Sequence, residues 1–247
     1  MMKLRGFTLI ISAMAIATFL TVGALAVVPT GDSSKKADKP RLLAPINLAI
    51  LIQDDLVSRV SNEIETTRNF IRSLPSGSRV MVGYVTTGSL QVRQPFTTDL
   101  EKAAGSLRIP IASTSASAFN PYVEVIEALR KFDSEAKNQD AKNQNVLLLI
   151  SDGLDDSRGF DASVLQSVDL ERAIAEAKRR DVPIYSFYAP SVGLTGRSRL
   201  AASYGQSSLN RVSNETGGKA FFQGFSFVSF NSHFERLIDA LNNYEKP

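Results

Sequence analysis

Two hydrophobic patterns alternate along the chain after residue 41. Continuous apolar runs at residues 48–52 and 146–150 are typical of strands that are buried on both faces of a sheet. Between and after these runs, apolar residues recur at spacings of three and four, which is the pattern of an amphipathic helix. This part of the chain is therefore predicted to alternate strands with helices.

The helices are predicted from this spacing together with signals at their ends. The helix after the first strand begins near Val57 and stops before Pro75 and Gly77, since proline and glycine end helices. Asn120 followed by Pro121 marks the start of another helix, as a capping residue before a proline. The remaining predicted helices lie at residues 99–107, 170–177, 200–216 and 230–241.

Further strands are predicted at residues 79–86, 183–188 and 220–222. The first of these is followed by a turn at residues 87–89, so residues 90–96 are expected to return as an antiparallel partner. We expect an α/β fold, a doubly wound and mostly parallel sheet with helices on both faces and one antiparallel edge hairpin. In such sheets, ligands bind beyond the carboxyl ends of the strands.

The N-terminal residues have the composition of a targeting segment. Lys3 and Arg5 precede an apolar stretch at residues 7–28, and Ala24-Leu25-Ala26 resembles a cleavage site. Two interpretations stay open: a cleaved signal peptide, or an uncleaved membrane anchor through residues 7–28. Both predict an extracytoplasmic protein, periplasmic, secreted or anchored. Domains are predicted as 1–28 targeting segment, 29–41 linker and 42–247 folded domain.

Composition excludes several classes of function. Of the 28 basic and 25 acidic residues, six basic and two acidic ones lie within residues 1–41, which leaves a domain of net charge −1. A nucleic-acid-binding domain would be strongly basic, so nucleic acid is excluded as a partner. The chain has no cysteine and one histidine, His233, which excludes thiolate chemistry and multi-histidine metal centres. His233 is expected at a surface or half-buried position, and neither catalytic residues nor an organic cofactor are predicted.

Two of the predicted strands end in aspartates. Asp54 and Asp55 follow the first apolar run, and Asp152 follows the run at residues 146–150. The carboxyl ends of parallel strands meet at one edge of a sheet, so these carboxylates are expected to converge there. The convergence predicts a small acidic site.

These segments resemble the von Willebrand factor A (VWA) domain family, and more closely its bacterial VWFA-related subgroup. Asp54-Asp55-Leu56-Val57-Ser58 is similar to the family's Asp-x-Ser-x-Ser motif, and Ser151-Asp152-Gly153 to its Thr/Ser-Asp-Gly motif. The resemblance extends over about residues 46–243. It is supported by the segments at residues 70–75, 94–99, 215–218 and 222–224.

The resemblance implies a metal-ion-dependent adhesion site for Mg²⁺ or Mn²⁺, with Asp54, Ser58 and Asp152 as ligands. Such hard cations prefer about six oxygen ligands, and the family leaves one position open for a partner's carboxylate. Leu56 replaces the first serine of the motif and offers no ligand. Asn120 stands nearest to the position of the family's threonine, and Asp55 is a further candidate oxygen ligand. Metal binding is therefore expected to be weak or absent.

The implied function is a non-enzymatic, exported protein–protein interaction module whose protein partner the sequence does not identify. A membrane is expected to be contacted only through the N-terminal segment. Loops at residues 110–120, 154–168 and 190–199 are predicted to flank the strand ends and to contribute a partner surface.

Three alternatives stay open. Asp54 and Asp152 would serve only local structure if they accepted hydrogen bonds from backbone N–H groups of the following segments. A metal-assisted hydrolase would use Asp54, Asp55 and Asp152 together. A receiver-like domain would bind Mg²⁺ at the first two and accept a phosphoryl group on Asp152, although receiver domains lack the predicted hairpin.

Overall fold

The computed structural model describes residues 40–111, 119–135, 143–157, 167–223 and 228–243. The chain divides into two compact units, Met1–Asp38 and Lys39–Pro247, and every described residue belongs to the second. The predicted targeting segment and most of the predicted linker lie outside the described residues. Within the described part, no helix combines the length and the apolar character needed to cross a bilayer.

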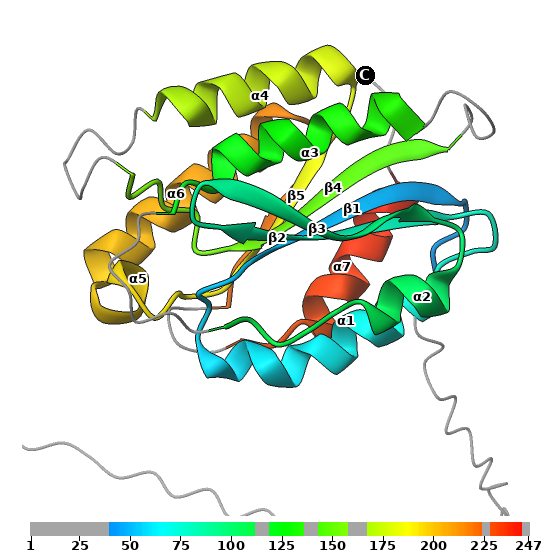
Figure 1. The fold of residues 1–247 in the computed structure, drawn as a ribbon, viewed down its shortest axis with the longest axis horizontal. Helices are drawn as coiled ribbons and strands as arrows, with labels where there is room; N and C mark the ends of the chain where they lie inside the picture. Colours follow the sequence, from blue (N-terminus) through cyan, green and yellow to red (C-terminus); the bar gives the residue numbers. More distant parts are fainter. Residues whose placement is uncertain (1–39, 112–118, 136–142, 158–166, 224–227, 244–247) are drawn as a thin grey trace, which may run out of the picture. The chain divides into compact units, whose positions relative to one another are not determined.

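The described strands form one mixed sheet in the order β3-β2-β1-β4-β5-β6 (Figure 1). All neighbouring strands pair in parallel except β2 and β3, which form the antiparallel edge hairpin. The predicted fold class is therefore confirmed. The strands are β1 (Ile46–Gln53), β2 (Arg79–Thr86), β3 (Ser89–Thr97), β4 (Gln144–Ser151), β5 (Ile184–Tyr188) and β6 (Ala220–Phe221).

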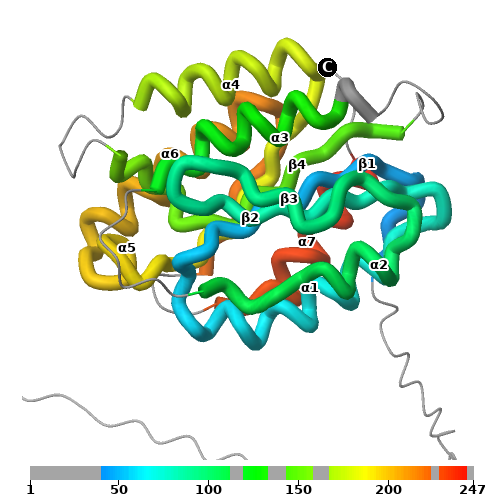
Figure 2. The backbone as a smooth tube through the Cα atoms, viewed as in Figure 1, coloured from blue at the N-terminus to red at the C-terminus, as the bar shows by residue number. Residues whose placement is uncertain are grey.

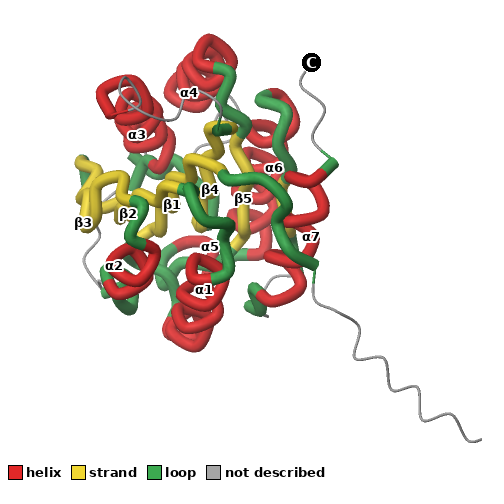
Figure 3. Tube along the Cα trace, turned by 90° about the vertical axis from the view of Figure 1, so that its right-hand side faces the viewer, coloured by secondary structure: helices red, strands yellow, loops and turns green. Residues whose placement is uncertain are grey.

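Helices cover both faces of the sheet, which lies between them as a middle layer (Figures 1 and 3). One hydrophobic core joins the sheet to α1, α2 and α7, and the other joins it to α3, α4 and α6. The helices are η1 (a 3₁₀ helix, Ser58–Asn62), α1 (Glu63–Arg72), α2 (Leu100–Gly105), α3 (Pro121–Glu135), α4 (Val168–Arg180), α5 (Leu194–Arg197), α6 (Arg199–Glu215) and α7 (Asn231–Asn242).

The predicted helices and strands are confirmed within a few residues of their ends, with one addition. The segment at residues 190–199 was expected as loop, but it contains the short helix α5. The β-bridge between Leu56 and Ser191 and the hydrogen bond from Val57 N to Pro190 O (3.0 Å) join the segment after β1 to the segment after β5. Figure 2 shows both segments at the same end of the sheet.

His233 is buried, which corrects the expectation of a surface or half-buried side chain. It is 1% exposed on α7 and lies among Phe187, Phe221 and Phe230, with ring centroids 5.1 to 6.4 Å away. Burial lowers the pKa of this imidazole to about 4, so it is neutral at neutral pH. The amphipathic spacing of the helix could have revealed this, because His233 shares a face with Leu237 and Leu241.

Two glycines allow α6 to pack directly against the end of β4. A Cβ atom added at Gly205 would lie 2.0 Å from the carbonyl oxygen of Asp152, so only glycine fits there. Gly153 has a φ of +78°, and a Cβ atom at that position would lie 2.3 Å from the carbonyl oxygen of Gly205. This close approach brings α6 against the strand end where the acidic site was predicted.

Candidate functional site

Asp152 directly follows β4 as a buried carboxylate, with 3% of the residue exposed. Its Oδ1 accepts a hydrogen bond from Leu154 N at 3.0 Å, and its Oδ2 accepts one from Thr195 Oγ1 at 3.0 Å. Burial is the main cause that raises the pKa of this carboxyl above its usual value. The bond to Leu154 stabilises the turn after β4, which is the local role that the sequence left open for Asp152.

Gln53 connects the ends of β1 and β4, and the sequence analysis did not identify it. Its Oε1 accepts hydrogen bonds from Ser151 Oγ at 2.6 Å and from Asp152 N at 3.2 Å. Its Nε2 donates to Oδ1 of Asp55 at 2.7 Å. Asp54 and Asp55 lie in the turn that follows β1, and this turn brings the Asp55 carboxylate back to the side chain of Gln53, two residues earlier. The available signal was a polar side chain at the last position of a strand that is otherwise mainly apolar.

Asp55 and Asp152 therefore belong to one buried polar network. Asp55 is 7% exposed, and burial followed by the charge of Asp152 raises its pKa to about 7. Burial also raises the pKa of Asp156 to about 6, and its carboxylate accepts a hydrogen bond from the backbone N–H of Phe119. Within the described residues, no group of three or more acidic or histidine side chains is arranged to hold a metal ion.

Asp54 has a different partner. Its two carboxylate oxygens accept hydrogen bonds from Nη1 and Nη2 of Arg108 at 2.5 and 2.7 Å, and Oδ1 also accepts one from Ile111 N at 3.0 Å. The guanidinium carbon of Arg108 lies 4.1 Å from the ring centre of Tyr84. The Tyr84 hydroxyl donates to the carbonyl oxygen of Arg108 at 2.6 Å, which holds this segment against β2. Both oxygens of Asp54 are thus taken up by a bidentate ion pair.

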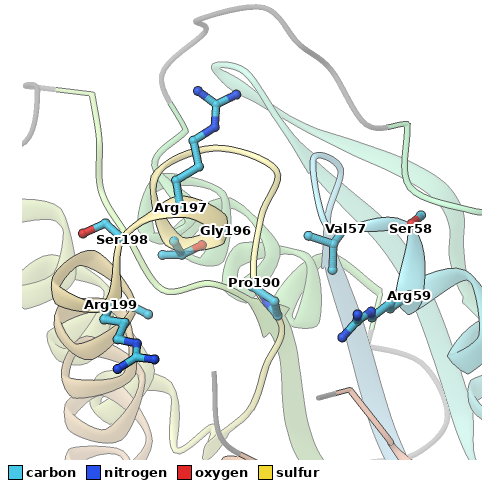
Figure 4. Close-up of a pocket in the computed structure, with 10 residues that line it drawn as sticks. Val57, Ser58, Arg59, Pro190, Gly196, Arg197, Ser198 and Arg199 are labelled. Carbon is cyan, nitrogen blue, oxygen red and sulfur yellow. The ribbon is translucent and has the colours of Figure 1, made fainter. Parts of the chain in front are cut away.

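The other candidate ligands lie in separate contacts. Asn120 caps α3, since its Oδ1 accepts from Tyr122 N at 3.2 Å, and its Nδ2 donates to Asp169 Oδ2 at 2.8 Å. Ser58 is exposed at the start of η1 and lines a cavity of about 480 Å³ together with residues of α5 and α6 (Figure 4).

The arrangement limits the chemistry of the three aspartates. Asp55 and Asp152 share the Gln53 network, whereas Asp54 pairs with Arg108, so the described contacts do not join all three as the hydrolase alternative requires. The antiparallel β2–β3 pair is the hairpin whose presence speaks against the receiver-like alternative. The neutral His233 is packed among the rings of Phe187, Phe221 and Phe230, so its described neighbours are aromatic rings and not these carboxylates.

Comparison with known proteins supports the fold. The sequence matches no protein-family model and no curated protein. An aerotolerance-related membrane protein from Bacteroides fragilis is 14% identical with a TM-score of 0.50, over 81% of this chain and 100% of that chain.

Two further solved structures are similar to this chain in fold. A von Willebrand factor type A protein from Catenulispora acidiphila is 15% identical with a TM-score of 0.55, over 80% of this chain and 43% of that chain. The manganese-loaded TRAP protein of Plasmodium vivax is 14% identical with a TM-score of 0.50, over 80% of this chain and 73% of that chain. At these identities the likeness concerns the fold, and the chain has the fold of the von Willebrand factor A domains, as its strand-end motifs predicted.

Proposed function

We propose that this protein is an exported, non-enzymatic protein-interaction module of the VWA type, in which divalent metal binding at the adhesion site is weak or absent. One observation carries the proposal: the aspartate that the adhesion motif would offer to a metal, Asp54, is paired at both oxygens with Arg108. A guanidinium at this place supplies the positive charge that a cation would otherwise supply.

The surface around the strand ends supports protein binding. Four large hydrophobic side chains on the segments beyond the strand ends are more than a third exposed: Ile109 at 56%, Ile111 at 64%, Leu194 at 37% and Leu200 at 54%. Large apolar side chains that are exposed on such segments are available for contact with another protein. Ile111 and Leu194 belong to the loops from which the sequence predicted a partner surface, and Ile109 and Leu200 directly adjoin those loops.

Export is proposed from the N-terminal sequence. The basic residues before the apolar stretch at residues 7–28 are typical of a secretory signal or an anchor whose basic end stays in the cytoplasm. The similar Bacteroides fragilis protein is described as a membrane protein, which agrees with a location at the cell envelope.

Metal titration tests the proposal directly. Full-length protein in mild detergent is expected to show no change in its melting temperature with millimolar Mg²⁺ or Mn²⁺, because Arg108 holds Asp54. A site filled at about 100 times its Kd would stabilise the fold by about 2.7 kcal/mol, which such a measurement detects easily. A saturable stabilisation that disappears in Asp152→Asn would contradict the proposal and support the metal-dependent adhesion site.

One observation favours the hydrolase alternative enough to test it. The pKa of Asp55, raised to about 7, is suited to a general base near neutral pH. The proposed module is expected to show no turnover of phosphate or carboxylic esters above background. Turnover that Asp55→Asn and Asp152→Asn both abolish would assign an enzyme instead.

A further inference from the structure

We propose that Glu124 makes the start of α3 sensitive to pH: its protonated side chain keeps α3 packed against α4 and the segment after β4, and its ionised side chain loosens this contact. α3 and α4 lie side by side on one face of the sheet (Figures 1 and 3). The start of α3 and the segment after β4 belong to loops assigned above to the partner surface. The inference therefore adds a regulation to the proposed function and rests on it for that assignment.

The side chain of Glu124 is buried without a full set of partners. The residue is 1% exposed, and within the described part of the chain its Oε2 atom has no hydrogen-bond partner. β1 and β4 contain no charged residue, and Arg93 of β3 is exposed, so these strands supply no buried charge to Glu124. An ionised carboxylate costs much more free energy in such a place than a neutral carboxyl group. The surroundings of Glu124 therefore favour its protonated form.

The charged groups that act most strongly on Glu124 are all acidic. They are Glu127 on α3 itself, Asp155 in the segment after β4 and Asp169 in the first turn of α4. Arg172, also on α4, forms an ion pair with Asp169 at 3.3 Å. Burial is the main cause that raises the pKa of Glu124 to about 7, and the three acidic neighbours act in the same direction. Glu124 therefore changes its charge close to neutral pH.

Two hydrogen bonds hold the start of α3 to its neighbours. The backbone N–H of Asp156 donates to the carbonyl oxygen of Phe119 at 2.9 Å, and Nδ2 of Asn120 donates to Oδ2 of Asp169 at 2.8 Å. Both bonds lie one to two helical turns from Glu124 along the chain. An ionised carboxylate is more stable where water reaches it, so ionisation of Glu124 favours local separation of the start of α3 from α4 and from the segment after β4.

The direction of the pH effect follows from the difference between the packed and the opened state. The packed state binds the proton of Glu124 more tightly, because the pKa is about 7 there and near its ordinary value of 4.5 where water reaches the carboxyl group. Opening is therefore favoured as the pH rises from about 4.5 to about 7, and the effect levels off above that range. Between pH 6 and pH 8, ionisation of Glu124 is expected to raise the opening constant about tenfold.

Hydrogen exchange of the full chain, corrected for the intrinsic effect of pH on amide exchange, measures this opening. Between pH 6 and pH 8, amides at the starts of α3 and α4 are expected to lose about tenfold more protection in the wild-type chain than in Glu124→Gln. Glutamine has the size of glutamate and does not ionise, so the variant stays packed at both pH values. Amides of α7, which packs on the opposite face of the sheet, are expected to show no such difference.

The matched control is Glu235→Gln, because Glu235 is exposed on α7 and its charge lies in water. This variant is expected to exchange as the wild-type chain does at both pH values. A pH effect that persists unchanged in Glu124→Gln would overturn the proposal, since another group would then cause it. An effect of equal size in all helices would also overturn it, because the whole domain would then unfold and no local contact would open.

A second measurement does not depend on the folding of a variant. Titration of the Glu124 carboxyl carbon by carbon-13 NMR in the wild-type chain is expected to show a midpoint near pH 7, and a midpoint near pH 4.5 would overturn the proposal. Both measurements use the protein without a partner, so their failure leaves the proposed interaction function standing. Conversely, if cross-linking in the native envelope captured no protein, that function would be contradicted and the exchange result would be unchanged.

Discussion

Replacement of Arg108 by methionine is expected to lower the free energy of unfolding by about 2 to 3 kcal/mol. The side chains of Arg108 and Asp54 are 23% and 14% exposed, so the variant leaves a carboxylate that is mostly buried without its positive partner. It also removes the stacking of the guanidinium on Tyr84, at 4.1 Å. Methionine keeps an unbranched apolar side chain where the arginine stem lies, so the loss of stability comes mainly from removal of the guanidinium group. Chemical denaturation in urea measures it.

Two further variants make this result interpretable. Arg72→Ala removes an arginine that is 37% exposed and pairs with Glu65 and Glu101 on the surface, so a loss of less than about 1 kcal/mol is expected. Asp54→Asn in the Arg108→Met background removes the uncompensated charge and is expected to recover part of the stability. No recovery, or a loss in Arg108→Met no larger than in Arg72→Ala, would contradict the structural role given to this pair.

Replacement of Asp55 by asparagine is expected to stabilise the protein at pH 8, by up to about 4 kcal/mol, and to have little effect near pH 4. The pKa of Asp55 is raised to about 7 in the folded state, so the native protein binds its proton more tightly than the unfolded chain. The contribution of Asp55 to stability therefore falls as the pH rises from about 4 to about 7, and it stays constant above that range. Asparagine does not ionise and still accepts the hydrogen bond from Gln53.

The measurement is the difference between the unfolding free energies of variant and wild type, followed from pH 4 to pH 8. This difference removes the contributions of Glu124 and His233, whose pKa values are also shifted by burial. Asp99→Asn is the matched control, because Asp99 is exposed and asparagine keeps its cap on α2. If the stability difference between variant and wild type does not grow with pH, or grows equally in the control, the pKa of Asp55 is not raised by burial.

Much of the fold could be predicted from local patterns. Both faces of β1 and β4 are buried, and each strand therefore reads as a continuous apolar run. One face of α1, α4 and α7 is buried, and apolar residues therefore recur there every three or four positions. Because burial repeats at every turn or pleat, these patterns are visible in the sequence. The hairpin followed from the turn between β2 and β3. The short helix α5 was missed because four residues carry too little periodicity to distinguish a helix from a loop.

The candidate site was predicted only in part. The sequence placed Asp54, Asp55 and Asp152 at strand ends, and the structure places Asp55 and Asp152 in one hydrogen-bond network through Gln53. In the structure, Asp54 forms an ion pair with Arg108, which lies 54 residues further along the chain, after α2. No local pattern indicates that pairing, because it depends on how the segment after α2 returns to the end of β1.

By itself, the sequence determined the alternation of strands and helices, the antiparallel edge, the near-neutral charge of the domain and the strand ends where acidic residues stand. The tertiary structure decided which of these residues meet: Asp54 pairs with Arg108, His233 is buried, and residues of η1, α5 and α6 line one cavity. The physical reason is the distance along the chain between the residues that interact. Periodic burial acts on residues a few positions apart, whereas ion pairs and cavities form between segments that only the completed sheet brings together.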